Sequence, residues 1–252
     1  MLPGKRSGRV AGRERRTSLW AGVAGGRPPR AGASAPFGLF REDRGALVAG
    51  LAFCGYALLF AIVRRNRSAA ADLALTLRLQ RRRAPWFTRL MTGVSWAGFP
   101  PQSRLIPPVL ALGFWVCGRP REALFQLLAV GATLLATVAK SQLRRPRPLA
   151  PLVRVVGAPL GGSSFPSGHV LSYIGVYGFF AHRVAEILRP AWLRRPVVAL
   201  IYGLLVLIGP SRIYQGHHWP TDVLASYLLG LSYLIGLTAL YRRALARWGA
   251  GS

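Results

Sequence analysis

The sequence is poor in acidic residues and in cysteine. It has 7 Asp and Glu against 34 Lys and Arg, which gives a formal net charge of +27. Its 2 cysteines, Cys54 and Cys117, both lie inside apolar stretches. Metal sites in proteins are built mainly from carboxylates, thiolates and clustered histidines, and these are too few and too scattered here. We therefore expect no metal site and no disulfide, and we interpret both cysteines as small buried hydrophobic residues.

Charged residues of both signs make up only 16% of the chain, whereas 52% of the residues are hydrophobic. The apolar residues form long uncharged blocks instead of alternating with polar ones, so lipid is the expected surrounding. The basic residues stand at the ends of these blocks, where a chain leaves an anionic membrane. No nucleic-acid-binding motif accompanies the charge. The expected partner is therefore the membrane and not nucleic acid.

The uncharged blocks predict an all-α integral membrane bundle of about six transmembrane helices, because a helix satisfies its own backbone groups within lipid. Residues 72–80 predict an interfacial helix after the first span. Residues 91–103 are uncharged but broken by Gly and Pro, so a partial span here leaves six or seven spans open. The expected spans are 45–63, 105–118, 123–139, 170–188, 197–210 and 223–241.

The charges outside the spans divide the chain into three parts and indicate its orientation. Residues 1–44 predict a basic, mostly disordered tail, residues 45–241 the transmembrane domain, and residues 242–252 a basic C-terminal tail. Arginines are concentrated at 119–121 and 183–195, opposite the polar clusters described next. The positive-inside rule therefore predicts that the clusters face the extracytoplasmic side, although that face is basic too.

Three clusters of polar residues interrupt the apolar pattern, at 140–148, 166–169 and 211–222. The first cluster begins where the third span ends, and the second ends where the fourth span begins, so both lie on one face of the membrane. The fourth and fifth spans cross and return, which brings the third cluster back to that face. The parity of the spans thus predicts a single site built from all three clusters.

The basic residues of these clusters are suited to binding a tetrahedral anion. Arg offers forked donors that match phosphate oxygens, and Lys offers a compact charge. Ser167 and Gly168 precede the fourth helix, whose first N–H groups are unpaired and attract phosphate. Each basic residue, taken alone, is also typical of a membrane-interface anchor. The predicted phosphate-binding residues are Lys140, Arg147, Ser167, Gly168 and Arg212.

Two histidines and one carboxylate are the candidates for the reaction itself. His218 and Asp222 are four residues apart at the start of the sixth helix, so they face the same way. Asp222 would accept a hydrogen bond from one imidazole nitrogen and leave the other as a nucleophile. His169, at the start of the fourth helix, is placed to act as a general acid. We interpret His217 as structural or at the edge of the substrate, and we assign no role to His182.

Together, the three clusters resemble the signature of the type 2 phosphatidic acid phosphatase superfamily, which is Lys-x6-Arg-Pro, Pro-Ser-Gly-His and Ser-Arg-x5-His-x3-Asp. Residues 140–222 match every position of this pattern. The resemblance implies a metal-independent phosphatase without a cofactor. It also implies that His218 attacks phosphorus to form a phosphohistidine, that Asp222 orients His218, and that His169 protonates the leaving oxygen and then activates water.

The resemblance implies a lipid phosphate or lipid pyrophosphate as substrate. The Arg- and Ala-rich composition is typical of a bacterial source, so we expect a plasma-membrane protein. Undecaprenyl pyrophosphate is then the first-choice substrate, and phosphatidic acid, phosphatidylglycerol phosphate and phosphorylated lipid A are alternatives. A lipid phosphotransferase with the same phosphohistidine stays open. A vanadium haloperoxidase would be soluble, and a purely structural membrane protein would leave the histidines without a role.

Overall fold

The computed structural model describes residues 42–158 and 160–249, and within these residues it is entirely helical. The predicted all-α class is therefore confirmed. The predicted N-terminal tail lies almost wholly outside the described residues. The helices are α1 (Glu42–Arg64), α2 (Ala69–Gln80), α3 (Pro85–Ser95), α4 (Gln102–Val116), α5 (Pro120–Leu128), α6 (Gly131–Gln142), α7 (Gly168–Ser172), α8 (Gly178–Ile187), α9 (Ala191–Tyr214) and α10 (Pro220–Gly249), with a 3₁₀ turn, η2 (Trp96–Gly98), and a π-helical turn, η3 (Tyr173–Tyr177).

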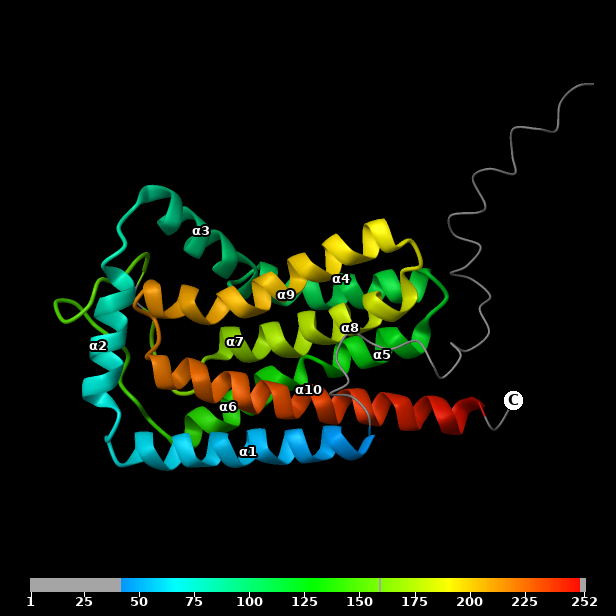
Figure 1. Cartoon of the computed structure of the whole chain (residues 1–252), viewed down its shortest axis with the longest axis horizontal. Coiled ribbons are helices and arrows are strands. Elements are labelled where there is room, and N and C mark those ends of the chain that lie inside the picture. Colours follow the sequence, from blue (N-terminus) through cyan, green and yellow to red (C-terminus); the bar gives the residue numbers. More distant parts are fainter. Residues whose placement is uncertain (1–41, 159, 250–252) are drawn as a thin grey trace, which may run out of the picture.

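The described chain makes six passes along the bundle (Figure 1). They are formed by α1, by α3 with α4, by α5 with α6, by α7 with α8, by α9 and by α10. Helix α1 packs along α10, and α3 and α8 pack against α9. Helix α2 stands across one end of the bundle, and the described chain begins and finishes at the other end (Figure 1).

Four segments are long and apolar enough to cross a membrane by length and composition, namely Arg44–Arg64, Pro120–Gln142, Ala191–Tyr214 and Pro220–Arg247. The two remaining passes are interrupted. α3 and α4 share one pass that breaks at η2, and Pro107 and Pro108 inside α4 remove backbone donors. The pass of α7 and α8 is interrupted by the π-helical turn. Residues 91–103 therefore do not add a seventh span, and α10 continues past residue 241, where the sixth span was expected to end.

The outer surface of the bundle is much more apolar than that of a soluble protein. Large apolar side chains cover the outside, and Leu51 of α1 and Val116 of α4 are 63% and 76% exposed. Polar side chains occupy much of the interior, where Ser95, Gln126 and Arg212 are fully buried. Such an outer surface is unsuited to water but suits lipid. The described helices therefore form an integral membrane bundle.

Helix α2 is the helix expected after the first span, and it turns its polar face toward the protein. Asp72, Thr76 and Gln80 recur every four residues, so they share one face, and all three are buried. Leu75 on another face is exposed. Gln80 donates through Nε2 to the carbonyl oxygen of Arg154 at 2.7 Å. Helix α2 thus covers the end of the bundle at which α9 finishes and α10 begins.

Candidate active site

The three polar clusters meet at the end of the bundle that α2 covers (Figure 1). The loop 143–167 joins α6 to α7 at this end, and the turn 215–219 joins α9 to α10. The structure therefore brings the clusters together, as the parity of the spans predicts. His169 lies within electrostatic range of Arg212 and His218. One site thus receives side chains from residues far apart in the sequence.

The turn between α9 and α10 places the nucleophile candidate, His218. Helix α9 ends in a Schellman motif, in which the N–H groups of Gly216 and His217 donate to carbonyl oxygens of the last turn at 2.9 and 3.1 Å. Gly216 has a φ of +71°, and a Cβ there would collide with the carbonyl oxygen of Arg154. Pro220 then begins α10, because its fixed φ suits the first helical position. The end of α9 and the start of α10 therefore fix the position of His218 in the turn between them.

The imidazole of His218 is buried and held at both nitrogens. Nδ1 lies 2.8 Å from the carbonyl oxygen of Ser164, and Nε2 lies 3.2 Å from a terminal nitrogen of Arg147. These partners assign the tautomer, because Nδ1 must donate to the carbonyl and Nε2 must accept from the guanidinium. Burial and the charges of Arg212 and Arg147 hold the pKa of His218 well below its usual value. The ring is therefore neutral near pH 7, as a nucleophile requires.

Asp222 does not make the hydrogen bond to His218 that the sequence predicts. Its Oδ2 lies 3.7 Å from Nδ1 of His218, beyond hydrogen-bond distance. Oδ2 instead accepts the backbone N–H of Trp219 at 2.8 Å, and Oδ1 accepts from Arg145 at 2.5 Å. The bond to Trp219 closes the first turn of α10 in the manner of a capping box. The carbonyl oxygen of Ser164 therefore takes the hydrogen-bonding position at Nδ1, and the carboxylate of Asp222 lies beside the ring without a hydrogen bond to it.

The backbone of the loop holds Arg147 beside the imidazole. Its Nε donates to the carbonyl oxygen of Gly161 at 3.0 Å. Its terminal nitrogens donate to the carbonyl oxygens of Ser163 and His217 at 3.2 and 2.8 Å. The nitrogen that contacts His217 is also the one that contacts His218. These contacts occupy four of the five N–H donors of Arg147, which leaves one N–H to meet a phosphate oxygen.

Lys140 extends from the last turn of α6 toward the first turn of α7. Its Nζ would lie 3.8 Å from a Cβ placed on Gly168, so the ammonium group sits directly beside that residue. The structure therefore places Lys140 and Gly168, both predicted to bind phosphate, next to each other. An open groove on the surface reaches Lys140 and gives a phosphate group a basic path to the site. The groove is lined by Lys140, Ser141, Arg144, Arg145, Pro146, Gly162 and Ser163.

Arg212 is fully buried in the last turn of α9. It donates to Oγ of Ser95 at 2.9 Å and to Nδ1 of His217 at 2.6 Å, and its guanidinium lies 5.0 Å from the ring centroid of Phe99. Its Nε has no hydrogen-bond partner among the described residues. A buried donor of this kind suits an anion. This contact holds the imidazole of His217 in place, and burial and Arg212 lower the pKa of His217 to about 4.

At the start of α7, the side chain of Ser167 and not its backbone amide is without a partner among the described residues. The backbone N–H of Ser167 donates to Oγ of Ser226 at 2.7 Å, so this amide is already used. The hydroxyl of Ser167 is buried and makes no hydrogen bond to any other described residue. A buried hydroxyl without a partner is unfavourable unless a ligand or water meets it. Ser167 is therefore suited to contact phosphate through its side chain.

Close packing holds His169, the candidate general acid, in place. Its ring meets that of Phe99 edge to face, with the centroids 4.6 Å apart. A Cβ on Gly98 would collide with the imidazole, so only glycine permits this approach of η2. Nε2 of His169 is buried, and no described residue forms a hydrogen bond with it. This nitrogen is available for proton transfer.

Three residues near His218 were not predicted as site residues. Ser164 acts through its carbonyl oxygen, which leaves no signal in the sequence. Arg145 is drawn into a buried ion pair, although its place among other arginines indicated a membrane-interface anchor. Asp72 reaches the same ion pair from α2. Its signal was its isolation, since it is the only acidic residue in 44–121.

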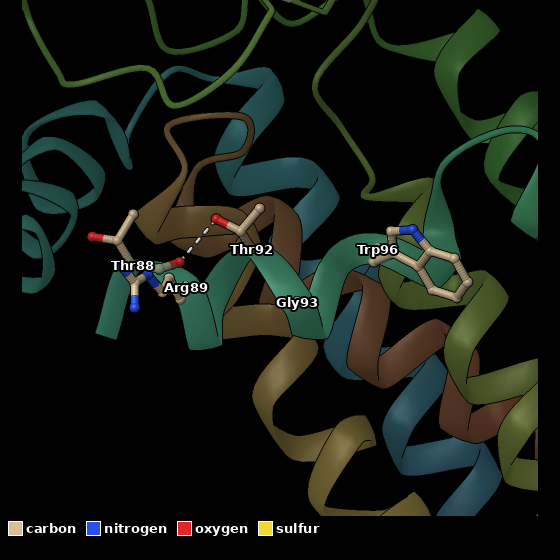
Figure 2. Close-up of a pocket in the computed structure, with 5 residues that line it drawn as sticks. All are labelled: Thr88, Arg89, Thr92, Gly93 and Trp96. Carbon is tan, nitrogen blue, oxygen red and sulfur yellow. Dashed lines mark hydrogen bonds between the residues drawn. The ribbon is translucent and has the colours of Figure 1, made fainter. Parts of the chain in front are cut away.

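The outer face of α3 has a separate hollow, which Figure 2 shows lined by Thr88, Arg89, Thr92, Gly93 and Trp96. None of the predicted site residues lines it. Ser95, the last residue of α3, contributes to the active site through its contacts with Ser211 and Arg212. Within the part of the chain that the structure describes, no group of three or more His, Cys, Asp or Glu side chains is arranged to hold a metal ion.

Comparison with known proteins agrees with the motifs. A family model of the PAP2 superfamily matches residues 122–246. Phosphatidylglycerophosphatase B of Bacillus subtilis (strain 168) is 33% identical over 184 residues, which cover 71% of this chain and 87% of that protein. The crystal structure of a transmembrane PAP2-type phosphatidylglycerolphosphate phosphatase from Bacillus subtilis has a TM-score of 0.68 at 27% identity, and the match covers 77% of this chain and 96% of that one.

A second solved structure, LpxE of Aquifex aeolicus, has a TM-score of 0.52 at 26% identity, and the match covers 67% of this chain and 93% of that one. The chain therefore belongs to the PAP2 superfamily. It is an integral membrane phosphatase of that superfamily, with the motif residues gathered at one end of its helical bundle. Helix α2 lies outside the region that the family model matches.

Proposed function

We propose that the chain is a lipid phosphate phosphatase that works through a phosphohistidine at Nε2 of His218. The observation that carries this proposal is the position of Nε2, which is buried and unprotonated and lies 3.2 Å from Arg147. Because Nδ1 donates to Ser164, Nε2 is the nitrogen whose lone pair can attack. The positive charges of Arg212 and Lys140 also act on this ring, which favours an incoming phosphoryl group.

The reaction has two steps. In the first, Nε2 of His218 forms a bond to phosphorus while the bond between phosphorus and the lipid oxygen breaks. The leaving oxygen keeps the electron pair of that bond and takes a proton from His169, which enters this step as an imidazolium and leaves it as a neutral imidazole. In the second step, water loses a proton to His169 and attacks phosphorus. The bond between phosphorus and nitrogen breaks, which releases inorganic phosphate and the neutral imidazole.

The surrounding charges match the changes during the reaction. Arg147, Arg212 and Lys140 meet the negative charge on the equatorial oxygens, and the hydroxyl of Ser167 donates to one of them. The imidazole becomes positive when Nε2 bonds to phosphorus. The carboxylate of Asp222, 3.7 Å from Nδ1, stabilises that positive charge. The cations thus provide the charge that a metal ion supplies in other phosphatases.

The relatives, and not the geometry of the site, favour a particular substrate. The names of both Bacillus subtilis relatives specify phosphatidylglycerol phosphate. We therefore propose phosphatidylglycerol phosphate as the first substrate, which was an alternative in the sequence analysis. Undecaprenyl pyrophosphate, the first choice from composition, stays a prediction and is the second candidate. Both carry a terminal phosphate on a membrane lipid, which the basic groove accommodates.

Phosphate release by the purified wild-type chain in mixed micelles tests this function. We expect a kcat/KM for phosphatidylglycerol phosphate at least about 10-fold above those for phosphatidic acid, undecaprenyl pyrophosphate and phosphorylated lipid A. We expect excess EDTA to leave the rate unchanged and vanadate to inhibit, because vanadate resembles the trigonal-bipyramidal phosphorus. Loss of activity that Mg²⁺ or Zn²⁺ restores would overturn the mechanism. Transfer of phosphate to an added lipid acceptor would identify a phosphotransferase instead.

We also propose that the site faces the extracytoplasmic side. The loop at 119–121 and the arginines at 194–195 lie at the opposite end of the bundle, where α1 also begins (Figure 1). Nine basic residues precede α1 in the sequence, at 1–41. The six passes, however, place the arginines at 64–67 and 81–83 at the site end of the bundle. The difference in charge between the two ends is therefore smaller than it would be with seven spans. The excess still favours a cytoplasmic opposite end.

Labelling with a membrane-impermeant maleimide in spheroplasts tests the orientation. In a chain with Cys54 and Cys117 replaced by alanine, Leu149→Cys at the site end should react without permeabilisation. Trp192→Cys, at the opposite end, should react only after the membrane is opened. Both positions are exposed, at 55% and 75%, so access to reagent depends on the side of the membrane. The reverse pattern would place the site in the cytoplasm.

A further inference from the structure

A buried chain of charges joins α2 to the catalytic end of α10. Arg145 lies between two carboxylates, with one terminal nitrogen 2.6 Å from Oδ2 of Asp72 and the other 2.5 Å from Oδ1 of Asp222. The side chain of Arg145 is 10% exposed, and those of the two carboxylates are 1% and 0% exposed. Arg145 also lies 5.9 Å from the ring centroid of Trp219. Neither Asp72 nor Arg145 belongs to the three motifs.

Asp72 is bonded to α10 directly as well as through Arg145. Its Oδ1 accepts the backbone N–H of Thr221 at 2.9 Å, and its Oδ2 accepts the hydroxyl of Thr221 at 2.8 Å. Arg145 contacts the same hydroxyl at 2.7 Å. The backbone N–H groups of a first helical turn have no partner inside the helix, so Asp72 satisfies one of them from another helix. The register of α2 and the start of α10 are therefore mutually fixed.

The three charges of Asp72, Arg145 and Asp222 together determine the electrostatic potential at the imidazole of His218. If Arg145 were paired with Asp222 alone, the two charges would cancel, and little negative charge would remain near the imidazole. Asp72 neutralises Arg145, so the trio carries a net charge of −1, and its inner end is the carboxylate 3.7 Å from Nδ1. Charge at this distance acts strongly in a buried site, where water screens little.

We propose that Asp72 and Arg145 are positioning residues for catalysis, which hold Asp222 in place and keep its negative charge available to the imidazole of His218. The proposal rests on the function proposed above, because that charge matters only when the imidazole becomes positive. It assigns to α2, outside the matched family region, a part in the active site. A purely structural ion pair would stabilise the fold without affecting the reaction selectively.

Removal of Arg145 in the Asp72→Asn background separates the two roles. Asp72→Asn should lower kcat by about 10-fold to 100-fold and change KM by less than about 3-fold, because the phosphate-binding residues are unaltered. Asp222→Asn alone should lower kcat by about 10²-fold to 10³-fold. Arg145→Gln added to Asp72→Asn should raise kcat at least about 3-fold above that of Asp72→Asn, because removal of the unpaired cation returns the net charge of the trio to −1.

Glu122 provides a matched control for a buried carboxylate paired with arginine. It contacts Arg119 and Arg183 at 3.3 and 3.4 Å and accepts from the hydroxyl of Tyr241 at 3.1 Å. Tyr241 lies about 28 Å from Asp222 along α10, at 1.5 Å per residue. Glu122→Gln should lower the melting temperature while kcat stays within about 2-fold of wild type.

A conservative variant supports this comparison and keeps the proposal testable if Asp72→Asn does not fold. Asp72→Glu keeps the negative charge but displaces it by one methylene, so it should lower kcat less than Asp72→Asn does. A double variant of Asp72→Asn and Arg145→Gln that is no more active than Asp72→Asn would overturn the proposal, as would a wild-type kcat in folded Asp72→Asn. If Asp72→Asn does not fold, a wild-type kcat in Asp72→Glu would overturn the positioning role. A wild-type chain that releases no phosphate from any lipid would instead overturn the proposed function.

Discussion

His218→Gln should lower phosphate release by at least about 10⁴-fold, which corresponds to about 5.5 kcal/mol of barrier. Glutamine has nearly the volume of histidine, and its amide can still donate to the carbonyl oxygen of Ser164, so the fold should be kept. It has no nucleophilic nitrogen to take the place of Nε2. Steady-state phosphate release measures the loss. Rapid quenching with alkali, under which phosphohistidine survives, should trap a labelled phosphoenzyme in the wild type and none in His218→Gln.

His182→Gln is the matched control for this prediction. His182 is also buried, and its Nε2 lies 3.4 Å from Glu186 at the opposite end of the bundle. Its replacement should alter the melting temperature and leave turnover within about 2-fold of wild type. A His218→Gln chain that melts like the wild type and still forms a phosphoenzyme would exclude Nε2 of His218 as the nucleophile. Equal losses of turnover in the two variants would point to a general sensitivity of the fold.

His169→Ala should separate the two steps of the reaction. With a lipid phosphate, formation of the phosphoenzyme should slow by about 10²-fold to 10⁴-fold, because the alkoxide must leave without a proton. An aryl phosphate that carries the same lipid tail has a leaving group that needs no proton. With this substrate, formation of the phosphoenzyme should slow by less than about 10-fold. Breakdown of the phosphoenzyme should be slow for both substrates, since water has lost its base. Rapid-quench measurement should therefore find a burst of aryl alcohol followed by an accumulated phosphoenzyme.

The burst is the decisive measurement for His169. If it slows as much with the aryl phosphate as with the lipid phosphate, His169 does not protonate the leaving oxygen. Its contact with Phe99 would then be the main reason for its position, as a packed ring that shapes the site. Phe99→Leu is a useful companion variant, because it loosens the packing and keeps the imidazole. It should reduce both rates in the same proportion and leave the difference between the substrates intact.

The class of fold and the residues of the candidate site could both be predicted from the order of residues along the chain. The length of the uncharged blocks indicates the membrane-spanning helices, and the number of spans between two clusters indicates whether they emerge on the same side of the membrane. Residues 140–148, 166–169 and 211–222 must share a face whatever the details of packing. The extra helix at 72–80 was also predictable, because the segment consists mainly of good helix formers, although its polar and apolar residues alternate like those of a strand.

The hydrogen-bond partners within the site depend on packing between distant segments, and the sequence does not encode them in a local pattern. The spacing of His218 and Asp222 makes a direct bond plausible, but the backbone of Ser164 enters from another loop and lies 2.8 Å from Nδ1, against 3.7 Å for the carboxylate. Backbone carbonyls are common to every residue, so no composition reveals which one will be the acceptor. The span count likewise depended on how α3 and α4 share one pass.

The sequence by itself determined the helical membrane class and the common face of the candidate reactive residues, because membrane crossing converts order along the chain into sides of a bilayer. Only the tertiary structure decided that Arg145 is buried between Asp72 and Asp222 and is not a membrane anchor. An arginine at the end of a span has the same sequence context in both situations. What separates them is a carboxylate from α2, which only the packing of that helix across the end of the bundle brings within 2.6 Å.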